Sequence, residues 1–246
     1  MADYGVPRGT RVGETAIVTG AAGGIGEAVA RRLAATGTRC VVVDRNPMVE
    51  QVAVAIGGTA LVGDLADPDL SLRAVAAAGD RLDMLVLNAG VNSADKDLAD
   101  LDLDRYQAVV GVNQHSVVYG LRAALPVMRR HGAGSIVATA SLAALRGTPQ
   151  DPVYTMTKHA VIGLVRSLSG PLAQEGIRFS AVCPGLVDTP LVAGGRERFR
   201  AAGIPMLGAD EVAAAVEQTL RTAESGTELV VRPGQALARY TPAPLP

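Results

Sequence analysis

Residues 15–44 read TAIVTGAAGGIGEAVARRLAATGTRCVVVD, and this stretch decides the fold. The apolar run at 15–19 predicts a short buried strand, and the glycine-rich turn 20–26 follows it at once. A helical pattern follows the turn, and a second apolar run at 39–43 ends on Asp44. The order is therefore strand, glycine-rich turn, helix, strand and acid.

The glycine-rich turn has a composition that suits a phosphate group. Its glycines at 20, 24 and 26 give G-x-x-x-G-x-G, which differs from the common G-x-G-x-x-G pattern. Glycine allows a tight turn and lets a pyrophosphate approach the backbone, while the following helix offers free N–H groups and a positive dipole end. An ordinary glycine-rich loop is the alternative. The flanking strands and Asp44 favour a dinucleotide site.

Asp44 lies about twenty residues beyond the turn, where a carboxylate can accept hydrogen bonds from the ribose diol of adenosine. The same carboxylate would repel a 2′-phosphate, so Asp44 favours NAD. Arg45 favours NADP, because its guanidinium could bind that phosphate. No basic residue lies within the turn, so we expect NAD, with NADP as the alternative.

Helix and strand patterns alternate along the rest of the chain. The expected helices cover about 47–56, 67–78, 103–130, 153–175 and 209–221, and the expected strands cover about 60–62, 84–87, 135–139, 177–182 and 228–231. This alternation predicts an α/β fold with a parallel sheet and helices on both faces. We expect a single domain over 1–246, with a loose lead-in at 1–14 and an irregular proline-rich tail at 241–246.

Composition narrows the possible partners. The 23 basic and 24 acidic residues form no long run of either sign, so we expect neither a nucleic-acid partner nor electrostatic attachment to a membrane. The N-terminus lacks a signal-peptide pattern and no apolar run approaches a membrane span, so we expect a cytoplasmic protein. Cys40 and Cys183 stand alone in apolar runs, which indicates two reduced, buried thiols and no metal site.

A second stretch, SLAALRGTPQDPVYTMTK at 141–158, carries candidate chemistry. Tyr154 and Lys158 are four residues apart, so a helix places both side chains on one face. Ser141 stands after the predicted strand 135–139, at its carboxyl end. A hydroxyl, a phenol and an ammonium group would then converge at a place suited to proton chemistry on a carbonyl or an alcohol.

Further motifs occur in order along the chain. They are Thr19-Gly20-x-x-x-Gly24-Ile25-Gly26, Asp64, Asn88-Ala89-Gly90, Asn113, Ser141, Tyr154-x-x-x-Lys158, and Pro184-Gly185 with Thr189. Together they resemble the short-chain dehydrogenase/reductase family, of the small single-domain type, over nearly the whole chain. The resemblance implies a Rossmann-type, doubly wound parallel sheet of about seven strands with helices on both faces.

The resemblance implies a catalytic set made of Asn113, Ser141, Tyr154 and Lys158. Tyr154 would be the general acid/base that interconverts a secondary alcohol and a ketone. A free phenol has a pKa of about 10 and needs help to ionise. Lys158 would supply a nearby cation and bind the nicotinamide ribose. Ser141 would bind the substrate oxygen, and Asn113 would hold a water that links Lys158 to solvent.

The resemblance also implies the cofactor contacts. The expected cofactor-binding residues are Gly20, Gly24, Ile25, Gly26, Asp44, Arg45, Asp64, Leu65, Asn88, Ala89, Gly90, Tyr154, Lys158, Pro184, Gly185, Val187 and Thr189. Asp64 and Leu65 would contact adenine, and the backbone of Val187 would hold the carboxamide. Two alternatives stay open: Asp64 caps the following turn, and Thr189 caps a short helix.

The substrate is expected to be a small apolar secondary alcohol or ketone. The residues expected to line its site are Leu142, Ala143, Leu145, Gln150, Val153, Leu186 and a lid at 191–207, which shows no clear periodicity. Arg196, Arg198 and Arg200 alternate in this lid and are expected to face solvent, with an anion-binding cluster as the alternative. An NADP(H)-dependent 3-oxoacyl thioester reductase and a catalytically silent NAD-sensing regulator are the alternatives. The family usually forms homotetramers through helices such as those expected at 103–130 and 153–175 and through the last strand region.

Overall fold

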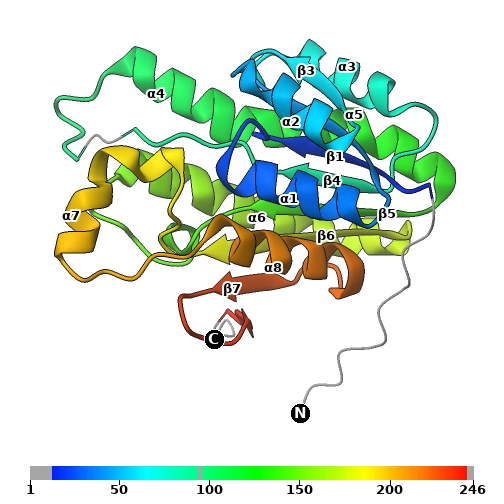
Figure 1. Ribbon diagram of the computed structural model, residues 1–246. Coiled ribbons are helices and arrows are strands. Elements are labelled where there is room, and N and C mark those ends of the chain that lie inside the picture. The colour runs from blue at the N-terminus through cyan, green and yellow to red at the C-terminus, as the bar shows by residue number, and fades with distance from the viewer. Residues whose placement is uncertain (1–12, 94–95, 243–246) are drawn as a thin grey trace.

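One eight-stranded sheet forms the centre of the computed structural model, which describes residues 13–93 and 96–242. The strands are β1 (Thr15–Thr19), β2 (Arg39–Asp44), β3 (Thr59–Val62), β4 (Met84–Leu87), β5 (Gly134–Thr139), β6 (Ile177–Pro184), β7 (Glu228–Val231) and β8 (Ala238–Arg239). Their order across the sheet is β3-β2-β1-β4-β5-β6-β7-β8 (Figure 1). The first seven strands pair in parallel, as predicted. The short antiparallel β8 was not predicted.

Helices cover both faces of the sheet. They are α1 (Gly24–Ala35), α2 (Met48–Ile56), α3 (Pro68–Ala78), α4 (Leu103–Val110), α5 (Ser116–His131), α6 (Pro152–Gln174), α7 (Arg196–Ala201) and α8 (Ala209–Thr222). Residues of α1, α2 and α8 pack into one apolar core, and residues of α3, α5 and α6 pack into the other. Side chains alternate along each strand, so Ile17 belongs to one core and Val18 to the other.

Two of the predicted segments differ in the structure. The helix expected over 103–130 is interrupted by a π-helical turn, η1 (Gly111–His115), between α4 and α5. The segment 191–207 contains a 3-10 helix, η3 (Pro190–Gly195), and then α7. The absence of periodicity there was misleading, because α7 has no buried residue and therefore no apolar face to reveal it. Of the expected lead-in and tail, residues 13–14 and 241–242 are irregular and the rest lies outside the described residues.

The strand order brings the candidate residues to one edge of the sheet. From β1 the chain builds the sheet in one direction through β2 and β3, and from β4 it builds the sheet in the other direction. The strand order therefore reverses between the neighbouring strands β1 and β4. In parallel sheets, ligands bind beyond the carboxyl ends of the strands at such a reversal. Figure 1 shows α4 and α7 together at one end of the molecule. Within the described part of the chain, we found no helix with the length and apolar character needed to span a bilayer.

Candidate active site

The glycine-rich turn packs too tightly to admit side chains. A Cβ on Gly26 would lie 2.1 Å from the carbonyl oxygen of Gly20, and a Cβ on Gly20 would lie 2.7 Å from Cα of Ala89. Gly23 occupies the N-cap position of α1 and provides no side-chain hydrogen bond. The N–H groups at the start of α1 are therefore not capped by a side chain, which suits an anion such as a diphosphate.

Asp44 lies beside the glycine-rich turn, as its position in the sequence predicts. Its Oδ2 accepts a hydrogen bond from the backbone N–H of Ala22 at 2.9 Å, and its Oδ1 accepts one from the N–H of Asn46 at 2.9 Å. The carboxylate is half-buried, whereas the neighbouring Arg45 is exposed. These contacts fix the carboxylate beside the glycine-rich turn, where a dinucleotide would bind.

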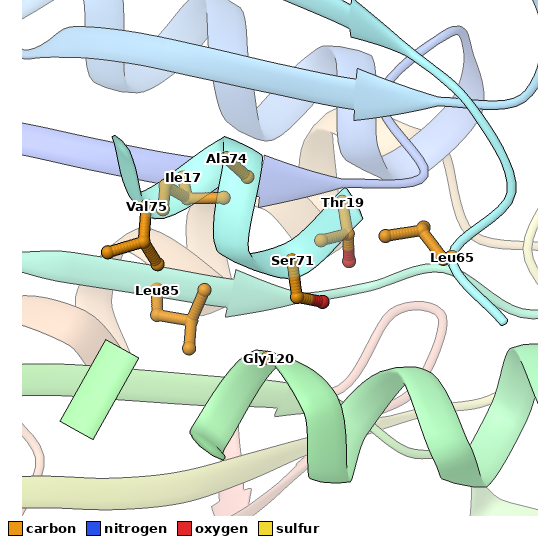
Figure 2. A pocket seen from close by; sticks show the side chains of 8 residues that line it. All are labelled: Ile17, Thr19, Leu65, Ser71, Ala74, Val75, Leu85 and Gly120. Atoms are coloured by element: carbon orange, nitrogen blue, oxygen red, sulfur yellow. The ribbon is translucent and has the colours of Figure 1, made fainter. Parts of the chain in front are cut away.

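Asp64 and Leu65 follow β3 in a loop. The Oδ1 of Asp64 accepts a hydrogen bond from the N–H of Ala66 at 2.9 Å, so the structure shows the capping contact that was the alternative. The side chain of Leu65 is buried and lines a small hollow in the core, together with Thr19 (Figure 2). The volume of this cavity is about 10 Å³. That is room for about one water molecule, so this hollow is not a substrate site.

The segment Asn88-Ala89-Gly90 joins the glycine-rich turn to the catalytic candidates. The Nδ2 of Asn88 donates to the carbonyl oxygens of Thr19 at 3.1 Å and of Gly20 at 3.2 Å. The hydroxyl of Thr19 accepts from the N–H groups of Asn88 and Ala89. A Cβ on Gly90 would lie 3.3 Å from Nζ of Lys158. Gly90 therefore leaves the space that the lysine head group needs.

Asn113 lies in the π-helical turn η1 and is completely buried. Its Oδ1 accepts from the N–H of Val91 at 2.8 Å, and its Nδ2 donates to the carbonyl oxygen of Val91 at 2.9 Å. The Nδ2 also donates to the hydroxyl of Thr157 at 3.0 Å, which lies next to Lys158 in α6. The π-helical turn, a feature that is frequent at functional sites, brings this amide against both the loop after β4 and α6.

Ser141, Tyr154 and Lys158 come together, as their spacing predicts. Ser141 lies close enough to the phenol of Tyr154 to lower its pKa, and Nζ of Lys158 lies 5.6 Å from the centre of the Tyr154 ring. The Nζ of Lys158 also donates to the carbonyl oxygen of Thr139, at the end of β5, at 2.8 Å. Strand β5 and helix α6 thus place the three side chains at the carboxyl edge of the sheet.

Burial sets the proton affinity of both titratable groups. Desolvation lowers the pKa of Lys158 to about 8, which still leaves the ammonium group mostly charged at neutral pH. Desolvation raises the pKa of Tyr154 to about 12, opposed by the nearby Ser141 hydroxyl and reinforced by the charge of Asp151 and by Cys183. At neutral pH the protein therefore presents a protonated phenol beside a cation.

The residues after β6 lie against the glycine-rich turn. A Cβ on Gly24 would lie 3.0 Å from Cγ2 of Thr189, so these two residues are in close proximity. Thr189 occupies the N-cap position of η3 but makes no side-chain capping hydrogen bond. Val187 is buried and its backbone pairs with Leu207 in an isolated bridge. The predicted cofactor residues after Pro184 and Gly185 therefore lie beside the predicted diphosphate turn.

Two of the three lid arginines make ion pairs. The Nε of Arg196 lies 2.5 Å from Oδ1 of Asp188, and Nη2 of Arg200 lies 3.2 Å from Oδ2 of the same carboxylate. Arg198 lies over the ring of Phe199 at 5.5 Å. Arg198 and Arg200 are exposed, as expected, whereas Arg196 is half-buried, so the expectation was wrong for Arg196. Arg196 and Arg200 also pair with Asp188 and so attach α7 to the segment after β6.

The expected substrate-lining residues differ in exposure. Ala143 and Val153 are buried, Leu142, Leu145 and Leu186 are partly buried, and Gln150 is exposed. The sequence prediction did not include Asp151, a buried carboxylate that caps the N-terminus of α6 through the N–H of Tyr154. An acid followed by proline is a recognisable helix start, so the cap was detectable. Its second contact, with Ser93, joins residues that are 58 positions apart in the sequence and could not be detected there.

Both cysteines are free and buried, as predicted. Burial raises the pKa of Cys40 to about 11 and that of Cys183 to about 12. A thiol with such a pKa remains protonated and unreactive at neutral pH. Neither cysteine is therefore a candidate nucleophile.

Comparison with known proteins places this geometry in a family. A family model described as short chain dehydrogenase matches residues 14–198. Oxidoreductase UcpA of Escherichia coli (strain K12) is 37% identical over 194 residues, which cover 74% of this chain and 73% of that protein. D-beta-hydroxybutyrate dehydrogenase of Rhizobium meliloti (strain 1021) is 33% identical over 190 residues, 73% of each chain.

A solved structure shares most of this fold. The 3-ketoacyl-(acyl-carrier-protein) reductase from Brucella melitensis, complexed with NADH, superposes with a TM-score of 0.84 at 29% identity. The match covers 92% of this chain and 99% of that one. The Rossmann-like α/β fold predicted from the sequence is therefore confirmed, with eight strands in the sheet. The chain belongs to the short-chain dehydrogenase family of oxidoreductases.

Proposed function

We propose that this protein interconverts a secondary alcohol and a ketone with NAD, and that Tyr154 is the general acid/base. The observation that carries the proposal is the meeting of Ser141, Tyr154 and Lys158 at the carboxyl edge of the sheet. A protonated phenol with a serine hydroxyl beside it can hold a carbonyl oxygen and donate a proton to it. A substrate oxygen bound by both hydroxyl groups would be fixed for this proton transfer.

The residues around Tyr154 support that proton transfer. The charged Lys158 favours the phenolate that remains after Tyr154 donates its proton. The carbonyl oxygen of Thr139 and the space beside Gly90 hold the ammonium group in place. Asn113 fixes Val91 in the loop that follows Gly90. In the oxidation direction the same phenolate accepts the proton of the alcohol.

A nicotinamide dinucleotide fits the residues around the glycine-rich turn. The glycines that exclude side chains and the uncapped start of α1 suit a diphosphate. Asp44 would accept hydrogen bonds from the adenosine ribose, and Val187 and Thr189 would contact the nicotinamide end. The bound cofactor supplies the hydride that joins or leaves the substrate carbon. A structural relative described as a candidate gluconate 5-dehydrogenase, from Beutenbergia cavernae, carries NADP at low occupancy. Exposed Arg45 keeps NADP as the second candidate cofactor.

The proposed activity is tested by reduced-nicotinamide fluorescence. Purified protein is mixed with NAD⁺ or NADP⁺ and a panel of hydroxysteroids, 3-hydroxyacyl thioesters, sugar alcohols and small cyclic alcohols. We expect turnover with NAD⁺ of one class of apolar alcohol in this panel. Tyr154→Phe should lower that turnover at least about 100-fold and leave cofactor binding intact, whereas Tyr119→Phe should change neither. Equal turnover by Tyr154→Phe and the unaltered protein would refute the role of Tyr154.

The panel also separates the alternative functions. Turnover of 3-hydroxyacyl thioesters with NADP⁺ alone would favour the thioester reductase and assign Arg45 to the 2′-phosphate. Cofactor binding with no turnover on any class would favour an NAD-sensing regulator. Such a regulator needs none of the buried polar contacts around Lys158, and their presence is why we favour the enzyme.

We further propose that the protein is a homotetramer. Large apolar side chains stand exposed on three neighbouring elements: Leu103 on α4, Val118 on α5 and Met156 on α6. Burying such side chains against a second copy would remove apolar surface from water. Size-exclusion chromatography with light scattering would distinguish a tetramer from a dimer or a monomer.

A further inference from the structure

Three consecutive residues after β4 are each attached to a different part of the molecule. Val91 is held by the amide of Asn113 through both its N–H and its carbonyl oxygen. The Nδ2 of Asn92 donates to the carbonyl oxygen of Leu191 in η3 at 2.9 Å. Ser93 is completely buried and bonds to Asp151, the N-cap of α6. This segment therefore connects the π-helical turn, the lid and the helix that carries Tyr154.

The contact between Ser93 and Asp151 is unusually complete for a loop. The N–H of Ser93 donates to Oδ2 of Asp151 at 2.9 Å, and the Ser93 hydroxyl donates to Oδ1 at 2.6 Å. The same Oδ1 accepts from the N–H of Tyr154 at 2.9 Å. Asp151 is only 9% exposed. A single buried carboxylate thus joins the backbone of Tyr154 to the segment that Asn113 holds.

We propose that Asp151 is a positioning residue for Tyr154, and that Ser93 holds the Asp151 carboxylate in its place. An N-cap needs only one hydrogen bond to a backbone N–H of the first helical turn. Asp151 makes that bond and also fixes a loop 58 residues away in sequence. The inference rests on the proposed acid/base role of Tyr154 and adds what sets the place and proton affinity of its phenol.

Electrostatics supports this role. The groups that act on the Tyr154 phenol are the Asp151 charge, the Cys183 thiol of β6, the Ser141 hydroxyl and the Lys158 ammonium group. Asp151 raises the pKa of Tyr154, whereas the Ser141 hydroxyl lowers it. An anion near the phenol disfavours the phenolate, so the Asp151 charge adds to desolvation, which is the larger cause of the raised Tyr154 pKa.

Four variants separate charge from position. Asp151→Asn removes the charge, Asp151→Glu keeps the charge but displaces it, and Ser93→Ala removes one hydrogen bond to the carboxylate. Asp102→Asn is the matched control, because Asp102 caps α4 through the N–H groups of Asp104 and Arg105. Each variant is first compared for its urea midpoint, so that activity is expressed per folded protein.

For alcohol oxidation, removal of the Asp151 charge should make the phenol easier to ionise. We expect Asp151→Asn to move the acidic limb of the kcat profile to lower pH by about 0.5 to 1 pH unit and to lower maximal kcat about tenfold. Asp151→Glu and Ser93→Ala should lower kcat about threefold to tenfold with a smaller displacement of the limb. Asp102→Asn should leave both the limb and kcat unchanged.

A second measurement needs no turnover. The chain has five tyrosines, so a protein labelled at tyrosine Cζ with ¹³C gives few signals, and Tyr154→Phe identifies the one from Tyr154. With a Tyr154 pKa of about 12, roughly a tenth of the phenol is ionised at pH 11, and Asp151→Asn should raise this to between about a quarter and a half.

An unchanged Tyr154 signal in Asp151→Asn would overturn the proposal, whatever happens to kcat. If the signal moves while neither the unaltered protein nor any variant turns over a substrate, the positioning role stands and only the proposed activity fails. The two proposals can therefore fail separately.

Discussion

Lys158→Met tests the most consequential property of the site, a cation buried inside the protein. Lys158 is only 3% exposed, and desolvation lowers its pKa from 10.5 to about 8. The difference of about 2.5 pH units, at about 1.4 kcal/mol each, corresponds to about 3.5 kcal/mol of unfavourable free energy when the folded protein carries this charge. Methionine has nearly the same length and no charge, so the variant avoids that cost.

The pH dependence gives the prediction its sign. Between pH 8 and pH 10.5 the unfolded chain keeps the Lys158 proton more tightly than the folded protein does. The folded protein therefore gains stability relative to the unfolded chain as the pH rises through this window. Lys158→Met lacks this gain. The free energy of unfolding of the unaltered protein, measured against that of the variant, should rise by about 2 kcal/mol between pH 7 and pH 9.5.

At neutral pH the variant should be the more stable protein. It avoids about 3.5 kcal/mol of desolvation cost and loses the hydrogen bond from the charged Lys158 to the carbonyl oxygen of Thr139, worth about 1.5 to 3 kcal/mol. The result should be a gain of about 0.5 to 2 kcal/mol, together with loss of turnover, because Lys158 no longer favours the phenolate. Buried charged groups that a site needs for chemistry often reduce stability in this way.

Urea unfolding at several pH values measures the effect. The chain contains two lysines, and Lys96→Met is the matched control because Lys96 is exposed. The control should follow the unaltered protein at every pH. The raised pKa values of Cys40 and Cys183 reduce stability above about pH 9. The Cys40 effect is common to all three proteins and cancels, whereas the Lys158 charge lowers the pKa of Cys183, so the Cys183 effect cancels fully only between the unaltered protein and Lys96→Met. Parallel curves for the Lys158→Met variant and the unaltered protein would refute the argument from burial.

Two further predictions concern packing and a buried ion pair. Gly26→Ala places a Cβ 2.1 Å from the carbonyl oxygen of Gly20, so the urea midpoint should fall by the equivalent of about 3 kcal/mol or more. Gly163→Ala, at an open position within α6, should instead raise stability by about 0.5 to 1 kcal/mol; a loss there would show that this face of α6 is packed. Arg166→Met leaves the carboxylate of Glu228, 3% exposed, without the guanidinium that donates to both its oxygens at 2.6 and 2.9 Å. Because Arg166 is itself 45% exposed, we expect a loss of about 2 kcal/mol in urea unfolding rather than the larger cost of a fully buried pair, and no loss would mean that Glu228 is solvated.

Much of the fold could be predicted from the sequence because local signals and the tertiary structure agree. The run at 15–19 is apolar throughout, as a central parallel strand must be, and the structure buries all five residues of β1. The Tyr154–Lys158 spacing could be converted into a shared face because α6 is a regular helix there. Asp44 could be placed beside the turn because it ends β2, which is parallel to β1, so both strands end at the same edge of the sheet.

The parts that could not be predicted depend on which loops meet. Nothing near Ser93 indicates that its hydroxyl reaches Asp151, because the contact forms only after β4 and α6 have been assembled. The arginines of the lid show the same limit, since Asp188 becomes their partner only through the folding of α7 onto the segment after β6. Leu65 was expected at adenine, but its side chain lies in the core. Its backbone remains the part available to a ligand.

The buried polar residues of the site form two connected series of hydrogen bonds. The polar bonds run from the loop after β4 to η1 through Val91 and Asn113, and to the start of α6 through Ser93 and Asp151. Both connections end on α6, beside Lys158 and at Tyr154. A buried polar group without a partner costs about twice what a satisfied one contributes. These bonds pair the polar groups of Val91, Ser93 and Asn113 and the N–H of Tyr154, and they surround a phenol and an ammonium group whose pKa values are displaced in opposite directions.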